Sequence, residues 1–344
     1  MRIAVLSPVW FPVPPTGYGG IEWVVSLLAD GLVDAGHDVT LFASGDSHTR
    51  ARLAYVYETA PSSEIGRAQL EVHHALACFE RADEFDVIND HSGPPAAVIA
   101  GAVATPTVHT VHGPMLGEPG ALYEQIARVA PRTGLISISM NQRVPRPDLP
   151  WIANVPNALD FSVYPVHPHR GDYLLFLGRM NHEKGAHRAV AAAMEAGVPL
   201  KIAGKKREPA EQLYFHEFVE PYLHDGQIEY LGEVSHGEKV ELLQNARATL
   251  FPIDWEEPFG LVMIESMACG TPVIATRRGS VPEVIEPGRS GIIVDDYREM
   301  AGVLEQADEL DPLELRLAAE ERFSRERMVE DYVDAYRRAI EQAG

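Results

Sequence analysis

Two glutamates, Glu257 and Glu265, stand on either side of a predicted helix start. Between them, Pro258 and Gly260 precede an apolar run, which places the first turn of a helix near Gly260. The first amides of a helix have no partner inside it and, with the helix dipole, favour an anion. We therefore predict that the amides of residues 260–262 bind a phosphate and that both carboxylates accept hydrogen bonds from sugar hydroxyls. The alternative is that the acids only complement the helix dipole.

Two basic residues follow a predicted strand over 173–178. Arg179 and Lys184 belong to the stretch Gly178-Arg-Met-Asn-His-Glu-Lys-Gly185. Ligands of doubly wound sheets bind beyond the carboxyl ends of the strands. A planar arginine fork and a lysine point charge can together hold a diphosphate without a metal ion. We predict a diphosphate clamp here; the alternative is two solvated basic residues in a loop.

A glycine-rich loop, Gly17-Tyr-Gly-Gly-Ile-Glu22, precedes a predicted helix over 20–35. A dinucleotide fingerprint needs a third glycine where Glu22 stands, and it follows the first strand directly. Here about ten residues, several of them prolines, separate the strand from the glycines. The glycine loop therefore does not support an NAD-dependent enzyme that transfers hydride. The helix start can still bind an anion, unless the glycines serve only a turn.

Two histidines, His109 and His112, lie around the end of a predicted strand in Val108-His-Thr-Val-His-Gly-Pro114. A zinc site would need a third ligand nearby, and the sequence shows no companion cluster. We expect both to be core or loop residues, although His112 could line an acceptor cleft.

Short apolar runs alternate with helical patterns along most of the chain, which predicts parallel sheets covered on both faces. The expected strands are 2–7, 38–43, 85–88, 107–110 and 135–139, then 173–178, 200–204, 228–231, 248–251, 273–275 and 291–294. Helices are expected over 20–35 and 186–196, among others. The fold class is therefore α/β, with two doubly wound units.

A proline-rich stretch, 144–170, separates the two series of strands and is expected to be an interdomain connector. The last stretch, 325–342, has apolar residues at spacings of three and four, so we expect an amphipathic helix that packs back onto the first domain.

Composition narrows the possible partners. The chain has 344 residues, 46% of them hydrophobic, and a net charge of −21. A field of that sign repels nucleic acid and anionic membranes, so we expect neither as a partner. No run is apolar enough to span a membrane, and the N-terminus has the pattern of a strand, so we expect a cytoplasmic protein. Cys78 and Cys269 are expected to be buried thiols.

Several of these motifs resemble glycosyltransferase family 4. The stretch 257–275, E-P-F-G-L-V-M-I-E-S-M-A-C-G-T-P-V-I-A, has the E-x7-E spacing of retaining glycosyltransferases. The stretches 178–185, V-P-N-A-L-D at 155–160, and 279–294 are also similar to that family, and the glycine loop resembles a bacterial subgroup of it. Asn89 and Ala158 depart from the family pattern, which has a histidine and a glycine there.

The resemblance implies a GT-B fold, in which two Rossmann-like domains face each other. We expect an acceptor domain over 1–165, a donor domain over 166–324, and a helix over 325–344 that returns to the first domain. The activity implied is that of a retaining glycosyltransferase. It would move a sugar from a nucleoside diphosphate sugar to a hydroxyl-bearing saccharide, glycolipid or secondary metabolite.

The resemblance also assigns roles to residues. Arg179 and Lys184, beside Gly178, would clamp the donor diphosphate, Glu265 would hold the ribose, and Glu257 the hydroxyls of the transferred sugar. The backbone of Phe259, Gly260, Leu261 and Val262 would meet the β-phosphate and sugar, and the backbone near Val234 the base. From the first domain, Gly20 would approach the phosphates, and His91 matches the histidine of the family near the reacting sugar.

No metal or other cofactor is expected, because the two cations and the helix terminus can stabilise the leaving diphosphate. A UDP-sugar is the first choice of donor, with GDP- and ADP-sugars as alternatives. Two other functions remain open: a sugar-nucleotide epimerase and a non-catalytic protein that binds sugar nucleotides.

Overall fold

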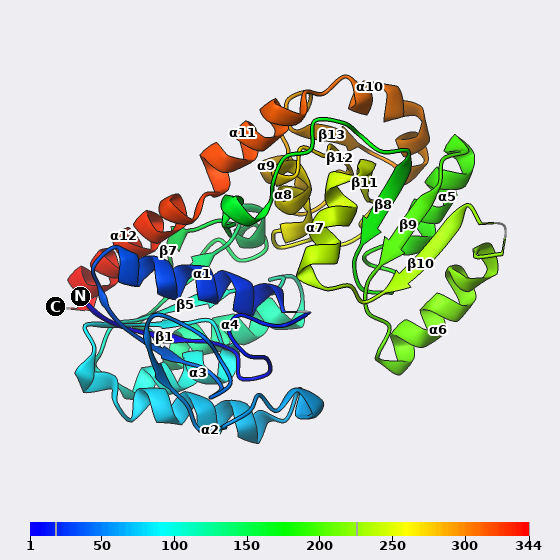
Figure 1. Ribbon diagram of the computed structural model, residues 1–344. Coiled ribbons are helices and arrows are strands. Elements are labelled where there is room, and N and C mark those ends of the chain that lie inside the picture. The colour runs from blue at the N-terminus through cyan, green and yellow to red at the C-terminus, as the bar shows by residue number, and fades with distance from the viewer. Residues whose placement is uncertain (18, 225, 344) are drawn as a thin grey trace. The chain divides into compact units, whose positions relative to one another are not determined.

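The computed structural model describes residues 1–17, 19–224 and 226–343, and the chain divides into two compact units (Figure 1). The first unit contains Met1–Leu159 together with Arg325–Gly344, and the second contains Asp160–Ser324. The division after Leu159 lies a few residues before the boundary expected at residue 165.

The first unit is built on a seven-stranded sheet in the order β3-β2-β1-β4-β5-β6-β7. Every strand pair in it is parallel. The strands are β1 (Arg2–Leu6), β2 (Asp38–Phe42), β3 (Arg52–Ala54), β4 (Val87–Asp90), β5 (Thr107–Val111), β6 (Thr133–Ser137) and β7 (Trp151–Asn154).

Helices cover both faces of this sheet, as a parallel sheet requires. Apolar side chains of α2 (Ala68–Phe79), α3 (Pro94–Ile99) and α4 (Glu118–Val129) form the core on one face. On the other face, α1 (Gly20–Asp34) and α12 (Arg325–Ala343) contact each other, and α12 also contacts β4, β5 and β7.

Helix α12 belongs to the first unit although the chain reaches it last (Figure 1). Its buried stripe includes Met328, Tyr332, Ala335 and Tyr336, at the spacing that predicts an amphipathic helix. Tyr332 and Tyr336 are among the largest fully buried side chains of the chain, so this helix contributes substantially to the core.

The prediction of a connector over 144–170 is wrong in one respect, because β7 lies within it. β7 pairs with β6 at the edge of the sheet, and all four of its residues are half-buried. Pro150 and Pro156 flank it, and prolines are tolerated beside an edge strand, where one row of backbone groups has no partner strand. The prolines that suggested a linker therefore mark the ends of a short edge strand.

The second unit repeats the architecture with six parallel strands in the order β10-β9-β8-β11-β12-β13. The strands are β8 (Tyr173–Leu177), β9 (Leu200–Ala203), β10 (Ile228–Gly232), β11 (Ala246–Phe251), β12 (Val273–Thr276) and β13 (Gly291–Val294). The main core packs against α5 (Ala186–Ala196), α6 (Pro209–Phe218) and α10 (Leu304–Asp308).

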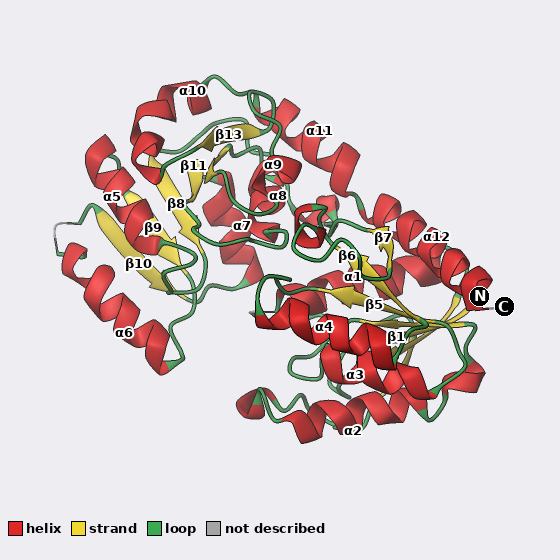
Figure 2. Cartoon of the chain, turned by 180° about the vertical axis from the view of Figure 1, so that it is seen from behind, coloured by secondary structure: helices red, strands yellow, loops and turns green. Residues whose placement is uncertain are grey.

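The other face of that sheet carries α7 (His236–Gln244) and α8 (Leu261–Ala268), with α11 (Pro312–Phe323) packed on α8 (Figure 2). A short helix, α9 (Val281–Val284), precedes β13. Two doubly wound parallel sheets and the predicted α/β class are therefore confirmed.

Each sheet has one point at which the strand order reverses direction. In the first unit it lies between β1 and β4, and in the second between β8 and β11. Loops leave such neighbouring strands on opposite sides of the sheet, which opens a crevice at their carboxyl ends. The predicted site residues Arg179 and Glu257 follow β8 and β11, and His91 follows β4.

Two smaller expectations also hold. Cys78 and Cys269 are both buried free thiols. Within the described part of the chain, no helix is long and apolar enough to cross a membrane.

Candidate active site

Directly beyond the end of β8 lies an arginine that has no side-chain partner among the described residues. Gly178 directly follows the strand, and its amide donates to the carbonyl oxygen of Ala203 on the neighbouring strand, at 3.1 Å. Arg179 comes next and is partly exposed. Its guanidinium makes no hydrogen bond or ion pair with any residue in 1–17, 19–224 or 226–343. A cation that pairs with no other described residue is free to bind an anionic ligand.

Lys184 is positioned by the loop that follows. The Oδ1 atom of Asn181 accepts a hydrogen bond from the Lys184 amide at 2.9 Å, which folds the loop back on itself. The ammonium group of Lys184 forms an ion pair with Glu257, and it lies 4.8 Å from the ring centroid of Trp255. The second predicted phosphate ligand is thus held by an acid and an aromatic face.

Glu257 lies beyond the end of β11, in a tightly packed loop. A Cβ atom at Gly279 would lie 2.3 Å from the Glu257 amide nitrogen, so only glycine fits there. The Ser280 amide donates to the Glu257 carbonyl oxygen at 2.9 Å. In the side chain, Oε2 accepts from Lys184 and from the Trp255 indole at 3.1 Å, whereas Oε1 has no partner in the described chain.

Helix α8 begins at Leu261, with Gly260 as its N-cap, where the sequence predicts the start. Gly260 has a φ of 80°, a left-handed conformation that favours glycine. The amides of Gly260, Leu261 and Val262 find no acceptor among the described residues, as expected for a helix N-terminus. The preceding Phe259 is buried, and its carbonyl oxygen accepts from the Ser280 hydroxyl at 2.7 Å.

Glu265 lies one turn inside α8 and is held in the same way as Glu257. Its Oε1 atom accepts from the Tyr164 hydroxyl at 3.1 Å and from the Lys239 ammonium at 2.5 Å. Burial first, and then the neighbouring Glu265 carboxylate, raise the pKa of Tyr164 well above its usual value, so the phenol stays a donor. The other carboxylate oxygen of Glu265, Oε2, has no partner in the part of the chain that is described.

The two carboxylates therefore share one design. Each is buried, and each has one oxygen held by a lysine and by an aromatic side chain that donates a hydrogen bond. The second oxygen of each carboxylate has no partner in the described chain. A carboxylate oriented in this way can accept a hydrogen bond from a hydroxyl without having to reorganise.

The segment predicted to meet the base lies at the start of α7. Val234 is partly exposed, and the neighbouring Glu233 forms a paired hydrogen bond with Arg207, at 2.5 and 2.7 Å. Ser235 caps α7 through a reciprocal pair of bonds with Glu238, so this backbone has a defined conformation.

In the first unit, His91 follows β4 and is only 2% exposed. Its Nδ1 atom lies 2.9 Å from Nε2 of His112, and its Nε2 atom lies 3.0 Å from Oδ1 of Asn89. Burial, followed by the two neighbouring histidines, lowers the pKa of His91 well below its usual value. His112 is the partly exposed member of the pair. The role predicted for His91 at the reacting sugar stays a prediction.

His109 is a core residue, as expected. Its ring nitrogens lie 2.5 Å from an Asp90 carboxylate oxygen and 2.8 Å from the Tyr123 hydroxyl. Across the described residues, no group of three histidine, cysteine or acidic side chains is arranged to hold a metal ion.

The glycine loop leads into α1, which begins at Gly20 with Gly19 as its N-cap. Tyr18 lies outside the described residues. Glu22 is 4% exposed, and a Cβ atom at Gly19 would lie 2.9 Å from its Oε2 atom. Burial raises the pKa of Glu22 to about 7, although its own amide lowers it somewhat. The approach of Gly20 to the donor phosphates stays a prediction.

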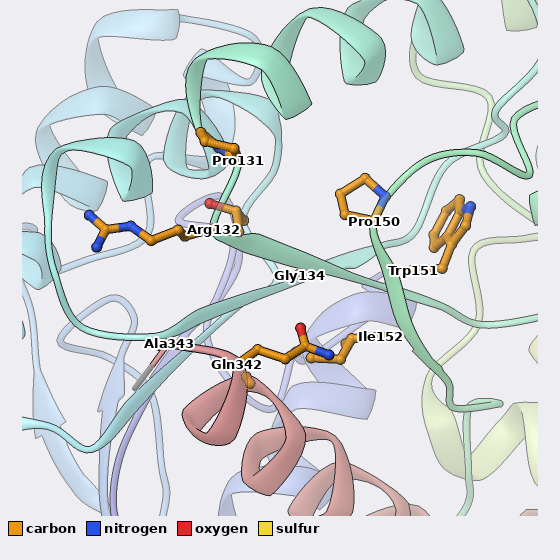
Figure 3. A pocket seen from close by; sticks show the side chains of 10 residues that line it. Pro131, Arg132, Gly134, Pro150, Trp151, Ile152, Gln342 and Ala343 are labelled. Carbon is orange, nitrogen blue, oxygen red and sulfur yellow. The ribbon is translucent and has the colours of Figure 1, made fainter.

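A pocket of about 290 Å³ lies elsewhere in the first unit (Figure 3). Its lining includes Thr133 and Trp151, the first residues of β6 and β7, with Ala339 and Gln342 of α12. Ligands of parallel sheets bind at the carboxyl ends of the strands, whereas this pocket lies at the amino ends. It is therefore separate from the predicted site.

Three residues that hold the two acids are missed by the sequence motifs, namely Tyr164, Lys239 and Trp255. Trp255 stands two positions before Glu257 and could have been noticed as part of that motif. Tyr164 lies 101 positions from Glu265, and nothing local in the sequence connects them.

Comparisons with known proteins identify the family of the chain. Residues 164–322 match the family model "Glycosyl transferases group 1", and residues 18–149 match "Glycosyltransferase Family 4". The chain is 28% identical to the glycogen synthase of Mycobacterium tuberculosis, over 88% of this chain and 84% of that one. It is 26% identical to the phosphatidyl-myo-inositol mannosyltransferase of Mycolicibacterium smegmatis, with the same coverage of 88% and 84%.

Solved structures show the same fold. The crystal structure of AviGT4, a glycosyltransferase involved in avilamycin A biosynthesis, matches with a TM-score of 0.74 and 27% identity over 99% of both chains. The Anabaena protein HepE, in complex with UDP, has a TM-score of 0.74 at 18% identity, over 97% of this chain and 98% of that one. The two family models together account for most of both units, and the chain belongs to the group 1/family 4 glycosyltransferases, enzymes of the GT-B fold that use nucleotide-sugar donors.

Proposed function

We propose that this glycosyltransferase binds a nucleoside diphosphate sugar at the switch point between β8 and β11, and transfers the sugar with retention to a hydroxyl group. The observation that supports it most is the matched pair Glu257 and Glu265, each with one anchored and one available oxygen. Glu265 would accept from the ribose hydroxyls and Glu257 from the transferred sugar. This arrangement fits a ligand with hydroxyl groups on both sides of an anion.

The diphosphate lies between these two ends in the proposed complex. The guanidinium of Arg179, the ammonium of Lys184 and the amides of residues 260–262 are the available donors. Lys184 is paired with Glu257 in the free protein, so it can hold that acid and a phosphate together. The base would meet the backbone near Val234. Gly20 and His91 of the first unit are proposed to contribute to the phosphate and sugar ends.

The reaction breaks the bond between the anomeric carbon and the diphosphate oxygen. The acceptor oxygen bonds to the anomeric carbon on the same face, and its proton passes to the departing phosphate oxygen. Negative charge grows on the diphosphate in the transition state, where fixed donors are most effective. Because side-chain cations and amides serve this role, we propose that no divalent cation is required.

The donor is proposed to be a UDP-sugar, with the acceptor a saccharide, a glycolipid or a secondary metabolite. The support comes from HepE, a structural neighbour in complex with UDP and with UDP-glucose. Other relatives are named as a glycogen synthase and a mannosyltransferase, so the family fold accommodates several acceptors.

A panel of UDP-, GDP- and ADP-sugars tests this proposal. We expect the sugar nucleotides of one class to raise the melting temperature of the protein. We also expect the protein to hydrolyse the preferred sugar nucleotide slowly when no acceptor is present. Proton NMR of the transferred product should show the anomeric configuration of the donor. Inversion of configuration would overturn the proposed retention, and release of an epimerised sugar nucleotide would indicate an epimerase instead.

A further inference from the structure

A chain of hydrogen bonds connects α12 with the partly exposed His112. The Tyr336 hydroxyl donates to Oδ1 of Asn89 at 2.7 Å, and the same oxygen lies 3.0 Å from Nε2 of His91. The other nitrogen of His91 lies 2.9 Å from Nε2 of His112. Tyr336, Asn89 and His91 are almost completely buried, so water cannot substitute for the bonds among these three residues.

The orientation of the Asn89 amide follows from its other neighbours. The side-chain amide of Asn89 has two polar atoms, and the one that does not face Tyr336 lies 3.4 Å from the Val108 carbonyl oxygen and 3.2 Å from the Thr110 hydroxyl. A carbonyl oxygen can only accept, so the atom facing Val108 is the amide nitrogen. The Tyr336 hydroxyl has no other acceptor in the described chain. The atom that faces Tyr336 and His91 is therefore the carbonyl oxygen.

The proton positions on both histidines now follow in turn. Because the Asn89 oxygen only accepts, Nε2 of His91 must carry a proton. A neutral imidazole has one N–H group, so Nδ1 of His91 accepts, and Nε2 of His112 must donate to it. Burial keeps both rings neutral: it lowers the pKa of His91, and burial with the nearby His109 lowers the pKa of His112 to about 3.

The last atom of the chain is Nδ1 of His112, which is left as an acceptor. It has no hydrogen-bond partner within the described residues, and the side chain of His112 is partly exposed. With the reverse set of tautomers, the same atom would carry a proton and would donate instead. The side-chain amide of Asn89 therefore decides whether this atom accepts a hydrogen bond from a hydroxyl group or donates one to a hydroxyl, carbonyl or phosphate oxygen.

We propose that Asn89 is a positioning residue, which fixes the tautomers of His91 and His112 so that Nδ1 of His112 accepts a hydrogen bond from a sugar or acceptor hydroxyl. The identity of that hydroxyl rests on the proposed function, whereas the tautomers do not. Tyr336 supports Asn89 by donating to the same oxygen. Preset hydrogen-bond polarity of this kind avoids reorganisation when a ligand binds.

The most direct test is the nitrogen-15 NMR spectrum of the full chain with labelled histidine. His91→Gln and His112→Gln serve only to assign the resonances. At pH 7 we expect His91 and His112 both to be neutral, with the proton on Nε2. A proton on Nδ1 of either ring, or a charged ring, would overturn the proposal. The tautomers are read from the wild-type spectrum, and the two variants serve to identify which resonances belong to His91 and His112.

Asn89→Asp then tests the direction of the chain. A carboxylate beside His91 favours the charged ring, whose Nδ1 then donates to His112 and drives the His112 proton to Nδ1. We expect this tautomer switch together with a fall in kcat of at least about tenfold, which is the effect of losing one hydrogen bond in the transition state. Tyr332→Phe is the control, because it removes a buried hydroxyl of the same helix that bonds Thr110 at 3.1 Å instead.

The outcomes separate the two proposals. A charged His91 in Asn89→Asp with the His112 proton still on Nε2 would overturn the relay, and so would a changed tautomer beside a neutral His91. A tautomer switch without loss of kcat would overturn its role in transfer. A switch of tautomers in Tyr332→Phe would also contradict the assignment to Asn89. A wild-type protein with the expected tautomers that transfers no sugar from any donor would instead contradict the proposed function.

Discussion

The two switch points hold their polar side chains in opposite ways. In the second unit, Glu257 and Glu265 are each fixed through one oxygen and keep the other available. In the first unit, both nitrogens of His91 are occupied, and only His112, at the end of the chain of bonds, is partly exposed. We therefore propose that the same architecture carries one site that contacts a ligand directly and one that sets hydrogen-bond polarity from within the core.

The largest expected effect is that of Arg179→Ala. The guanidinium has no partner in the described chain, so its loss should leave the melting temperature nearly unchanged. Removal of one donor to a developing oxyanion typically costs about 10²–10³ in rate, and we expect a fall of that size in kcat. Steady-state kinetics and a thermal melt of the same preparation measure both.

Arg188→Ala is the matched control for that experiment. Arg188 donates to the carbonyl oxygens of His182 and Pro252, at 3.1 and 3.0 Å, and forms an ion pair with Asp254. We expect it to lose stability and to keep more activity than Arg179→Ala. Activity of Arg179→Ala within a few-fold of wild type would remove Arg179 from the site.

Glu22, in the first unit, differs from Glu257 and Glu265 because this buried acid has no lysine partner among the described residues. Burial raises its pKa in the folded protein from 4.5 to about 7. Between these pH values the folded protein keeps a proton that the unfolded chain has lost. The free energy of unfolding therefore falls as the pH rises through this window, by roughly 3 kcal/mol in total.

Glu22→Gln should remove this pH-dependent fall in the free energy of unfolding. Urea denaturation at pH 5 and pH 8 should show a larger decrease for wild type than for the variant, by roughly 3 kcal/mol at most. The difference between the two proteins isolates Glu22 from the general repulsion of a chain with net charge −21. Equal pH slopes would show that Glu22 is not protonated at neutral pH in the folded state.

Tyr164→Phe tests the anchoring of Glu265 and should have a smaller effect. It removes one hydrogen bond to a buried carboxylate, which is worth about 1.5–3 kcal/mol. We expect KM for the donor to rise by roughly tenfold or more, with a modest loss of stability. Tyr173→Phe is the control, since that hydroxyl donates to the Leu242 carbonyl oxygen at 2.8 Å. Equal effects on KM would mean that Tyr164 is only a packing residue.

The smallest effect is expected for the removal of divalent cations. If Arg179, Lys184 and the α8 amides stabilise the leaving diphosphate, EDTA should leave kcat within about twofold of its starting value. An initial-rate assay before and after chelation measures this. Complete loss that Mg²⁺ or Mn²⁺ restores would show that the side-chain donors are not sufficient.

The features predictable from the sequence are those whose cause is local. Pro258 and Gly260 predicted the start of α8 because proline and glycine act on their own backbone. The hydrophobic spacing of α12 predicted its buried stripe for the same reason. β7 was missed because its residues are half-buried and flanked by prolines, which gives an edge strand a weak pattern.

The partners of the site residues could not be predicted in this way. Lys184 and Glu257 are 73 positions apart, and Tyr336 and Asn89 are 247 apart. Such pairs depend on strand order and on side-chain torsions, neither of which leaves a local pattern. The lack of a partner could not be predicted either: only the contacts in the structure reveal that the guanidinium of Arg179 has no partner in the described chain.

We propose that Glu265 holds the nucleotide and that Glu257 holds the transferred sugar. Isothermal titration of UDP and of the matching UDP-sugar into Glu257→Gln and Glu265→Gln tests it most directly. We expect Glu265→Gln to weaken the binding of both ligands by roughly tenfold or more. We expect Glu257→Gln to weaken only the UDP-sugar and to leave UDP binding unchanged or tighter, because Lys184 is released. Equal weakening of UDP and UDP-sugar by Glu257→Gln would show that Glu257 does not bind the transferred sugar.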